Sequence, residues 1–237
     1  MSGKSKYKRI IIKLSGEALA GENGFGLSRD MLQKVSNQLK VVSEMDVQIG
    51  IIIGGGNFWR GKQNLNMDRT TSDHMGMLAT VINALALQDV LEQSGVATRV
   101  QTALTITRVA EPYILRRAIR HLEKGRVVIF ACGTGNPYFS TDTGAALRAA
   151  EINAEVLFLA KNIDGIYDSD PKTNKNAVKL VNIAYMDFIK KGLKAMDTTA
   201  ISMCMENNIP IIAFGLNEKD SIIRAVSGDK IGTLIHP

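Results

Sequence analysis

The sequence has few of the features that mark secreted, membrane or metal-thiolate proteins. Its 237 residues include two cysteines, Cys132 and Cys204, which lie in apolar surroundings without the spacing of metal ligands. No run of ~18 uninterrupted apolar residues occurs, because Asn83 and Gln88 interrupt the longest candidate, from 75 to 91. The basic first residues lack the longer apolar region of a secretion signal. We therefore expect reduced thiols, no membrane segment and a cytoplasmic protein.

Two common nucleotide-binding motifs are also missing. The Walker pattern G-x-x-x-x-G-K-[ST] occurs nowhere in the chain. The run Gly54-Gly55-Gly56 does not have the G-x-G-x-x-G spacing of dinucleotide-binding proteins, and Gly24-Phe25-Gly26 follows no predicted strand. A nucleotide site in this chain therefore has to be built from other residues.

The formal net charge is +6, and part of it forms a basic segment after Pro112. Its charges alternate with Ile114, Leu115 and Ala118 at helical spacing, which is the pattern of an amphipathic surface helix. No nucleic-acid reading motif or basic-aromatic platform accompanies the segment, so we expect no nucleic-acid partner. Anionic nucleotide ligands explain part of the positive excess equally well.

Strand-like and helical runs alternate along the chain, which predicts an α/β protein: a three-layer α/β/α sandwich with a largely parallel central sheet. A chain of this length fits one domain, 1–237, that buries roughly 70% of its unfolded surface. Strands are predicted at 9–14, 47–53, 98–102, 127–131, 156–160, 209–214 and 233–235. Helices are predicted at 29–44, 73–93, 112–123, 143–153, 198–207 and 219–226.

A glycine run directly follows the apolar strand that ends at Ile53. Consecutive glycines let backbone amides approach a phosphate closely, and Arg60 adds a forked cation nearby. A strand-ending turn without a ligand is the alternative.

Lys13 is the second unusual feature, because it ends an apolar β-branched run and precedes a Ser-Gly turn. A lysine is rarely buried unpaired, so it either points into a polar site or protects an edge strand from aggregation.

Polar loops follow two further predicted strands. The segment 132–142 offers hydroxyl and amide groups, and Thr141 or Asp142 could cap the helix predicted to begin near Thr143. The segment 161–171 brings Tyr167 and several aspartates to a strand's carboxyl end, which suits a magnesium nucleotide. Ordinary turns without a ligand remain the alternative for both loops.

Taken together, these segments resemble the amino acid kinase family and, within it, the bacterial branch that acts on uridylate (UMP). The matching stretches are KLSGEAL from Lys13, GGGNFWRG from Gly54, SDHMGMLATVINALALQD from Ser72, GTGNPYFSTD from Gly133 and DGIYDSDP from Asp164. The resemblance covers nearly the whole chain. It implies transfer of the γ-phosphoryl group of ATP to UMP, in line and without a general base, with Mg²⁺ accompanying ATP.

The resemblance also assigns roles to residues. It implies catalytic roles for Lys13, Arg60 and Asp142. Implied ATP-binding residues are Lys13, Leu14, Ser15, Gly16, Gly56, Arg60, Lys161, Asn162, Tyr167 and Asp170, and either Lys161 or Asn162 meets the adenine. Implied UMP-binding residues are Gly55, Asp73, Thr134, Gly135, Asn136, Pro137, Tyr138, Phe139, Ser140 and Thr141. No direct metal ligand is assigned, and Met75, Met77 and Leu78 are expected to pack within the helix layer.

Regulation and assembly follow from the same resemblance. We expect a homo-oligomer, as in hexameric relatives, with GTP as an activator and UTP as an inhibitor. The segment Gly21, Glu22, Asn23, Gly24, Phe25 and Gly26 is the candidate GTP region, and a plain loop is its alternative. Two other functions stay open: a carboxylate or carbamate kinase of the acetylglutamate type, and a nucleotide-binding sensor without turnover.

Overall fold

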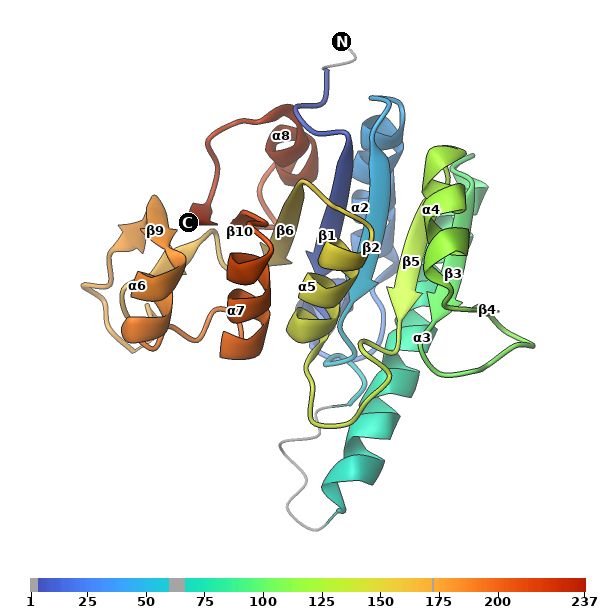
Figure 1. Cartoon of the computed structure of the whole chain (residues 1–237), viewed down its shortest axis with the longest axis horizontal. Coiled ribbons are helices and arrows are strands. Elements are labelled where there is room, and N and C mark those ends of the chain that lie inside the picture. The colour runs from blue at the N-terminus through green and yellow to red at the C-terminus, as the bar shows by residue number, and fades with distance from the viewer. Residues whose placement is uncertain (1–3, 60–66, 172) are drawn as a thin grey trace.

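The computed structural model describes residues 4–59, 67–171 and 173–237. Its centre is a nine-stranded sheet in the order β4-β3-β5-β2-β1-β6-β10-β11-β9 (Figure 1). The strands are β1 (Arg9–Leu14), β2 (Gln48–Ile53), β3 (Thr98–Thr102), β4 (Glu111–Pro112), β5 (Val127–Ala131), β6 (Val156–Lys161), β9 (Asn182–Ala184), β10 (Ile211–Gly215) and β11 (Thr233–His236). Neighbouring strands are parallel except β10 and β11, so β11 and its partner β9 run against the rest.

The central strands are apolar on both faces. Ile10, Ile11 and Ile12 of β1 are each fully buried, and their register neighbours in β2 and β6 are also buried hydrophobic residues or Gly50. Continuous β-branched runs of this kind are typical of parallel strands covered by helices on both sides. A short antiparallel pair, β7 (Ile166–Tyr167) and β8 (Lys179–Leu180), forms a second sheet.

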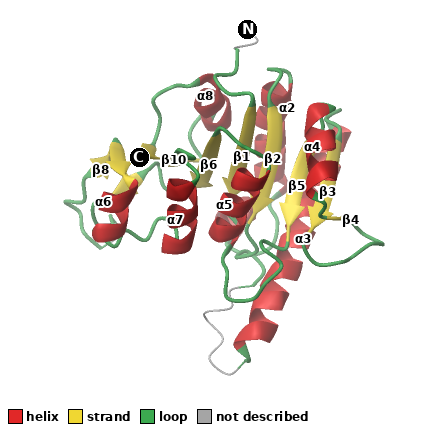
Figure 2. Cartoon of the chain, viewed as in Figure 1, coloured by secondary structure: helices red, strands yellow, loops and turns green. Residues whose placement is uncertain are grey.

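Helices form a layer on each side of the sheet (Figure 2). The helices are α1 (Gly16–Ala20), α2 (Arg29–Ser43), α3 (Arg69–Gln93), α4 (Leu115–Glu123), α5 (Thr141–Glu151), α6 (Tyr185–Lys190), α7 (Thr198–Glu206) and α8 (Ser221–Ser227), with a 3-10 turn η1 (Gly21–Asn23). One apolar core lies between the sheet and the helices α2, α3 and α8. A second lies between the other face of the sheet and the helices α4, α5, α6 and α7. The predicted three-layer fold with a largely parallel sheet is confirmed.

The sequence correctly located the long elements but misplaced some of their ends. Helix α3 begins at Arg69 instead of Asp73, because the Asp68 carboxylate caps it by accepting the Thr71 N–H at 2.8 Å. Helix α5 begins at Thr141, and the predicted cap by Thr141 or Asp142 is wrong. Ser140 is the N-cap and its hydroxyl oxygen accepts from Asp142 N at 2.9 Å.

Helix α3 is long and apolar enough, by length and composition, to cross a membrane, but core helices meet the same criteria. Here it packs against α2, β2, β3 and β5. Asn83 is fully buried within it. The packing expected of Met77 is confirmed, whereas that expected of Leu78 is wrong, because Leu78 is 49% exposed on the outer face.

The parallel arrangement brings four strand ends to one edge. β1 ends at Leu14, β2 at Ile53, β5 at Ala131 and β6 at Lys161. All four predicted ligand segments follow these strands, and open α/β sheets bind ligands at this edge.

Candidate active site

Lys13 and Asp142 form an ion pair at the carboxyl edge of the sheet. The Lys13 Nζ lies 2.8 Å from Asp142 Oδ1, and Lys13 is 8% exposed. β1 supplies the lysine and the first turn of α5 supplies the aspartate. Of the two interpretations of Lys13, the polar-site one is confirmed, because β1 is the centre of the sheet and not an edge.

A second lysine shares this carboxylate. Burial works to raise the pKa of Asp142, but Lys13 and, further off, Lys161 together hold that pKa below its usual value. Burial lowers the pKa of Lys161, although the negative charge of Asp142 acts to raise it. The Lys161 ammonium donates to the Ala195 carbonyl. Lys13 and Lys161 therefore lie near Asp142, and the carboxylate of Glu17 also acts on Lys161.

The two turns after β1 and β2 touch each other, and glycine is needed where they do. A Cβ on Gly16 would lie 2.4 Å from the Gly54 carbonyl oxygen, and one on Gly55 would lie 2.6 Å from the Gly76 carbonyl oxygen. These glycines therefore allow close packing of the loop against α1 and α3. Ser15 is the N-cap of α1, but its side chain makes no capping hydrogen bond. The Leu14 side chain lies in the apolar core.

Buried amides fix the glycine loop to α3. Asn57 and Asn83 exchange two side-chain hydrogen bonds of 2.8 and 2.9 Å, and Asn83 also donates to the Gly54 carbonyl at 2.7 Å. Asn57 donates in turn to Gly26 O at 2.6 Å. The loop at the strand end is thereby tied both to a helix and to the segment 21–26.

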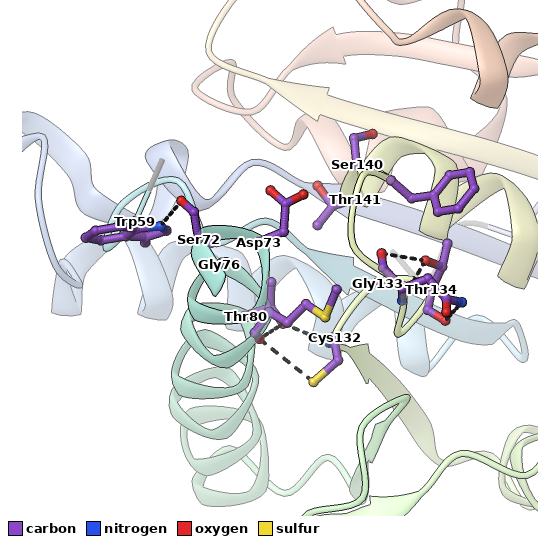
Figure 3. Close-up of a pocket in the computed structure, with 14 residues that line it drawn as sticks. Trp59, Ser72, Asp73, Gly76, Thr80, Cys132, Gly133, Thr134, Ser140 and Thr141 are labelled. Atoms are coloured by element: carbon purple, nitrogen blue, oxygen red, sulfur yellow. Dashed lines mark hydrogen bonds between the residues drawn. The ribbon is translucent and has the colours of Figure 1, made fainter. Parts of the chain in front are cut away.

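A polar pocket of about 250 Å³ lies between the start of α3 and the loop after β5 (Figure 3). Its lining residues are Gly55, Trp59, Ser72, Asp73, Gly76, Met77, Thr80, Cys132, Gly133, Thr134, Asn136, Phe139, Ser140 and Thr141. Seven of the ten residues expected to bind UMP are in that set. Gly135, Pro137 and Tyr138 are outside it, and the Tyr138 ring is 66% exposed.

Asp73 joins the two walls of this pocket. Its Oδ2 accepts the Tyr138 backbone N–H at 2.8 Å and the Arg69 Nε–H at 2.9 Å. The Arg69 guanidinium in turn lies 5.1 Å from the centroid of the Tyr138 ring. Asp73 therefore orders the loop as well as lining the cavity.

The loop after β5 has a constrained backbone. Cys132 and Tyr138 have φ values of +67° and +72°, and Gly133 and Gly135 are also left-handed. The Cys132 thiol is buried, which agrees with the apolar surroundings expected from the sequence. At the end of the loop, Asp197 accepts from the hydroxyls of Ser140 and Thr143.

A larger and more open cavity of about 620 Å³ lies beside β7. Of the expected adenosine-site residues, Lys161, Tyr167 and Asp170 line it. Asn162 is exposed and does not line it, so the geometry favours Lys161 over Asn162 at this place. The Tyr167 hydroxyl donates to Asp164 at 2.9 Å, and Lys179 lies 2.8 Å from the same carboxylate.

The described residues contain no group of three or more histidine, cysteine, aspartate or glutamate side chains placed to hold a metal ion. Asp142 and Asp197 line a common cavity between the two just described. Magnesium is commonly held by one or two carboxylates together with substrate phosphates, and this donor set fits that arrangement.

Arg60 and the segment 21–26 were also expected to bind ligands. Arg60 lies outside the described residues. The segment 21–26 is a 3-10 turn followed by left-handed Gly24 and Gly26. Phe25 is 67% exposed, and its ring centroid lies 5.7 Å from that of Phe58 in a T-shaped arrangement.

Several lining residues were not predicted from the sequence. Trp59 donates its ring N–H to Ser72 at 3.0 Å and lines the smaller pocket, although it stands within the glycine-rich segment itself. Asp197 was also missed. Its position immediately before a predicted helix, in the pattern Asp-Thr-Thr, is an N-cap signal that would have identified it as structurally important.

An open parallel sheet with two lysines and a polar pocket at its carboxyl edge defines a class of α/β proteins that bind phosphate-bearing small molecules. Residues 8–214 match the amino acid kinase family. The chain belongs to that family.

Solved structures of similar proteins agree with this placement. A UMP kinase from Bacillus anthracis is 37% identical, with a TM-score of 0.93 over 97% of this chain and 96% of that one. A UMP kinase from Ureaplasma parvum is 36% identical, with a TM-score of 0.91 over 98% and 100%. A uridylate kinase from Archaeoglobus fulgidus, 24% identical with a TM-score of 0.73 over 95% and 99%, shares the fold.

Proposed function

We propose that this protein is a UMP kinase, which transfers the γ-phosphoryl group of ATP to UMP and yields UDP and ADP. The observation that carries the proposal is the polar pocket between Asp73 and the loop 133–141, whose lining residue Thr141 directly precedes Asp142 of the Lys13–Asp142 pair. Identities of 36 and 37% over nearly the full length of two UMP kinases support the same assignment. Such an enzyme serves pyrimidine nucleotide synthesis in the cytoplasm.

The proposed reaction requires no covalent catalysis by the protein. A nucleotide monophosphate has a second pKa of ~6, so its attacking oxygen is largely ionised at neutral pH and needs no general base. The protein has to hold two repelling anions in line and neutralise the transferred group. In this proposal Lys13 and Lys161 supply positive charge, and Asp142 holds the ammonium of Lys13 in place.

ATP is assigned to the larger cavity lined by Lys161, Tyr167 and Asp170, and its phosphates extend toward Ser15, Gly16 and Gly56. Magnesium bound to those phosphates would add positive charge, and Asp142 is the carboxylate best placed toward it. Arg60 is proposed to act on the transferred group. In the acceptor pocket, the Asp73 carboxylate suits a ribose hydroxyl better than a phosphate, because it is an acceptor of hydrogen bonds.

Assembly and regulation belong to the same proposal. Leu78 and Ile82 are each 49% exposed on the outer face of α3, which is suited to contact with another subunit in a homo-oligomer such as a hexamer. GTP is proposed as an activator and UTP as an inhibitor. The segment 21–26 is a candidate GTP region because it is hydrogen-bonded to Asn57 of the glycine loop.

The test is ADP release with UMP, CMP, dUMP and N-acetylglutamate as separate acceptors. UMP should react well and CMP poorly, because exchanging a carbonyl for an amino group leaves buried polar groups unpaired, at about 1–3 kcal/mol per group. Equal rates with CMP and UMP would reject the assignment. A preference for N-acetylglutamate would favour a carboxylate kinase, and ATP binding without turnover would favour a sensor.

A further inference from the structure

Arg148 is a buried arginine that the proposed chemistry does not use. It lies in α5 and is 4% exposed. A buried guanidinium is costly unless its donors are paired, so its partners indicate why it is there. The ion pair Lys13–Asp142 is at the first turn of the same helix, and Arg148 follows almost two turns later.

Three groups surround the guanidinium. Its Nη1 donates to the Glu151 carboxylate, and its carbon lies 3.7 Å from the centroid of the Tyr113 ring. The Tyr113 hydroxyl donates to the same Glu151 oxygen at 2.5 Å. The third partner is the Gly133 carbonyl oxygen, which accepts from Nη2 at 3.4 Å. Ring and carboxylate thus hold the arginine against the acceptor loop.

The contact with Gly133 sets the direction of one peptide group. In a planar trans peptide the C=O and the following N–H point to opposite sides. A Gly133 carbonyl turned toward Arg148 therefore leaves the Thr134 N–H facing away from the arginine, in the stretch that lines the acceptor pocket. Within the described part of the chain this N–H donates to no other group.

This loop needs external support. Cys132 and Tyr138 have φ values of +67° and +72°, which residues other than glycine rarely adopt. Helix α5 also packs directly on the loop, since a Cβ on Gly144 would lie 2.9 Å from the Gly133 Cα.

We propose that Arg148 is a positioning residue for the acceptor: held by Tyr113 and Glu151, it orients the Gly133–Thr134 peptide so that the Thr134 N–H serves the acceptor nucleotide. This inference rests on the proposed function. A purely stabilising role explains the arrangement less well, because replacing a buried ion pair by apolar side chains is often neutral for stability.

The experiment compares Arg148→Lys and Arg148→Met with Arg9→Met. Arg9 is the matched control because its guanidinium also donates to a backbone carbonyl, Ile152 O at 2.6 Å, but at the opposite edge of the sheet. Arg148→Lys keeps the charge and loses the planar fork that contacts several groups at once. For both Arg148 variants we expect the KM for UMP to rise about tenfold, as for loss of one charged hydrogen bond. The KM for ATP should stay within about twofold, and Arg9→Met should change neither constant.

A binding measurement separates this inference from the proposed function. The chain has one tryptophan, Trp59, and it lines the acceptor pocket, so its fluorescence reports UMP binding without ATP. If the wild type does not phosphorylate UMP, the proposed function fails. If it does, and the Arg148 variants bind UMP as the wild type does or change both KM values equally, the positioning role is overturned. Should these variants not fold, Glu151→Ala decides, because it removes the carboxylate that pairs with Arg148: a selective rise in the UMP KM supports the role and no change overturns it.

Discussion

The acceptor side and the nucleotide side of this site are held together in different ways. Around the acceptor pocket, buried polar side chains bind backbone groups: Asn83 reaches Gly54, Thr80 accepts from Cys132 N at 2.8 Å, and Arg148 contacts Gly133. Around the nucleotide cavity, the short pair β7–β8 is held by the buried Thr233 hydroxyl, which accepts from Ile166 N at 2.9 Å, and by a half-buried ion pair of Asp164 and Lys179.

The difference matters because buried and exposed polar contacts have different energies. A buried group left without its partner costs about 1–3 kcal/mol, whereas an exposed ion pair contributes about 0–1 kcal/mol. A rigid acceptor side suits the task of distinguishing one nucleobase from another. On the nucleotide side the Asp164–Lys179 ion pair is the weaker kind of support, so its loss should be tolerated better.

The largest effect is expected at the point where the two sides meet. Lys13→Met should reduce turnover about a hundredfold or more, as for loss of one strong transition-state donor, while the protein stays folded. Steady-state kinetics and circular dichroism test this. Lys8→Met is the matched control, because Lys8 is an exposed lysine just before the same strand and should be dispensable. Wild-type turnover in the Lys13 variant would remove that lysine from the mechanism.

Next in size is a stability effect on the acceptor side. Asn83→Ala removes the partner of Asn57 and of the Gly54 carbonyl, both buried, and should lower the free energy of unfolding by about 3 kcal/mol. Asn37→Ala removes the exposed Gln33–Asn37 hydrogen bond of 2.9 Å and should change it by about 0.5 kcal/mol or less. Urea denaturation measures both. Equal losses in the two variants would contradict the distinction between buried and exposed amides.

A selective binding effect is expected at Asp73. Asp73→Ala should raise the KM for UMP about tenfold and leave the KM for ATP nearly unchanged, because it removes a ligand group and releases the Tyr138 N–H. Arg69→Ala, which removes the more exposed partner of the same carboxylate, should have a smaller effect. A parallel rise in both constants would show that Asp73 does not belong to the acceptor side alone.

The smallest effect is expected on the nucleotide side and depends on pH. The hydrogen bond from Lys179 is the main cause that lowers the pKa of Asp164 from 3.8. The stabilisation is therefore present above about pH 4 and is lost as the pH falls through the lower folded-state pKa. Lys179→Ala should cost at most about 1 kcal/mol at pH 7, less at high salt, and progressively less as the pH falls through the folded-state pKa of Asp164. A pH-independent loss would mean that the stem of the lysine, and not its charge, provides the stabilisation.

Local patterns in the sequence were enough to predict the main elements. The buried runs that became β1, β2, β5 and β6 were found because they are continuous and β-branched, and the position of the glycine loop and of Lys13 followed from them. The short helices α1 and α6 and the short strands β4 and β7 to β9 were missed, since their formation depends on tertiary contacts. Leu78 was expected to pack, because α3 is apolar around much of its circumference and the local pattern does not distinguish its outer face.

Many residues of the site were predicted from the sequence, but the contacts between them were not. Ser140, and not its neighbours, caps α5, because only the folded loop decides which hydroxyl reaches the helix N–H groups. Arg148 could not have been identified from its sequence position, since its partners Tyr113 and Gly133 come from distant segments. Contacts of high sequence separation are the part that local patterns do not encode.

Asp142 and Arg148 lie on the same helix, α5. The angle between their side chains about the helix axis is therefore set by the number of residues that separate them. One residue inserted between these positions would rotate Arg148 by ~100° about the helix axis and displace it by about 1.5 Å. The stretch from 142 to 148 should therefore tolerate substitutions far better than changes of length, because the helix fixes the distance and the angle between these two side chains.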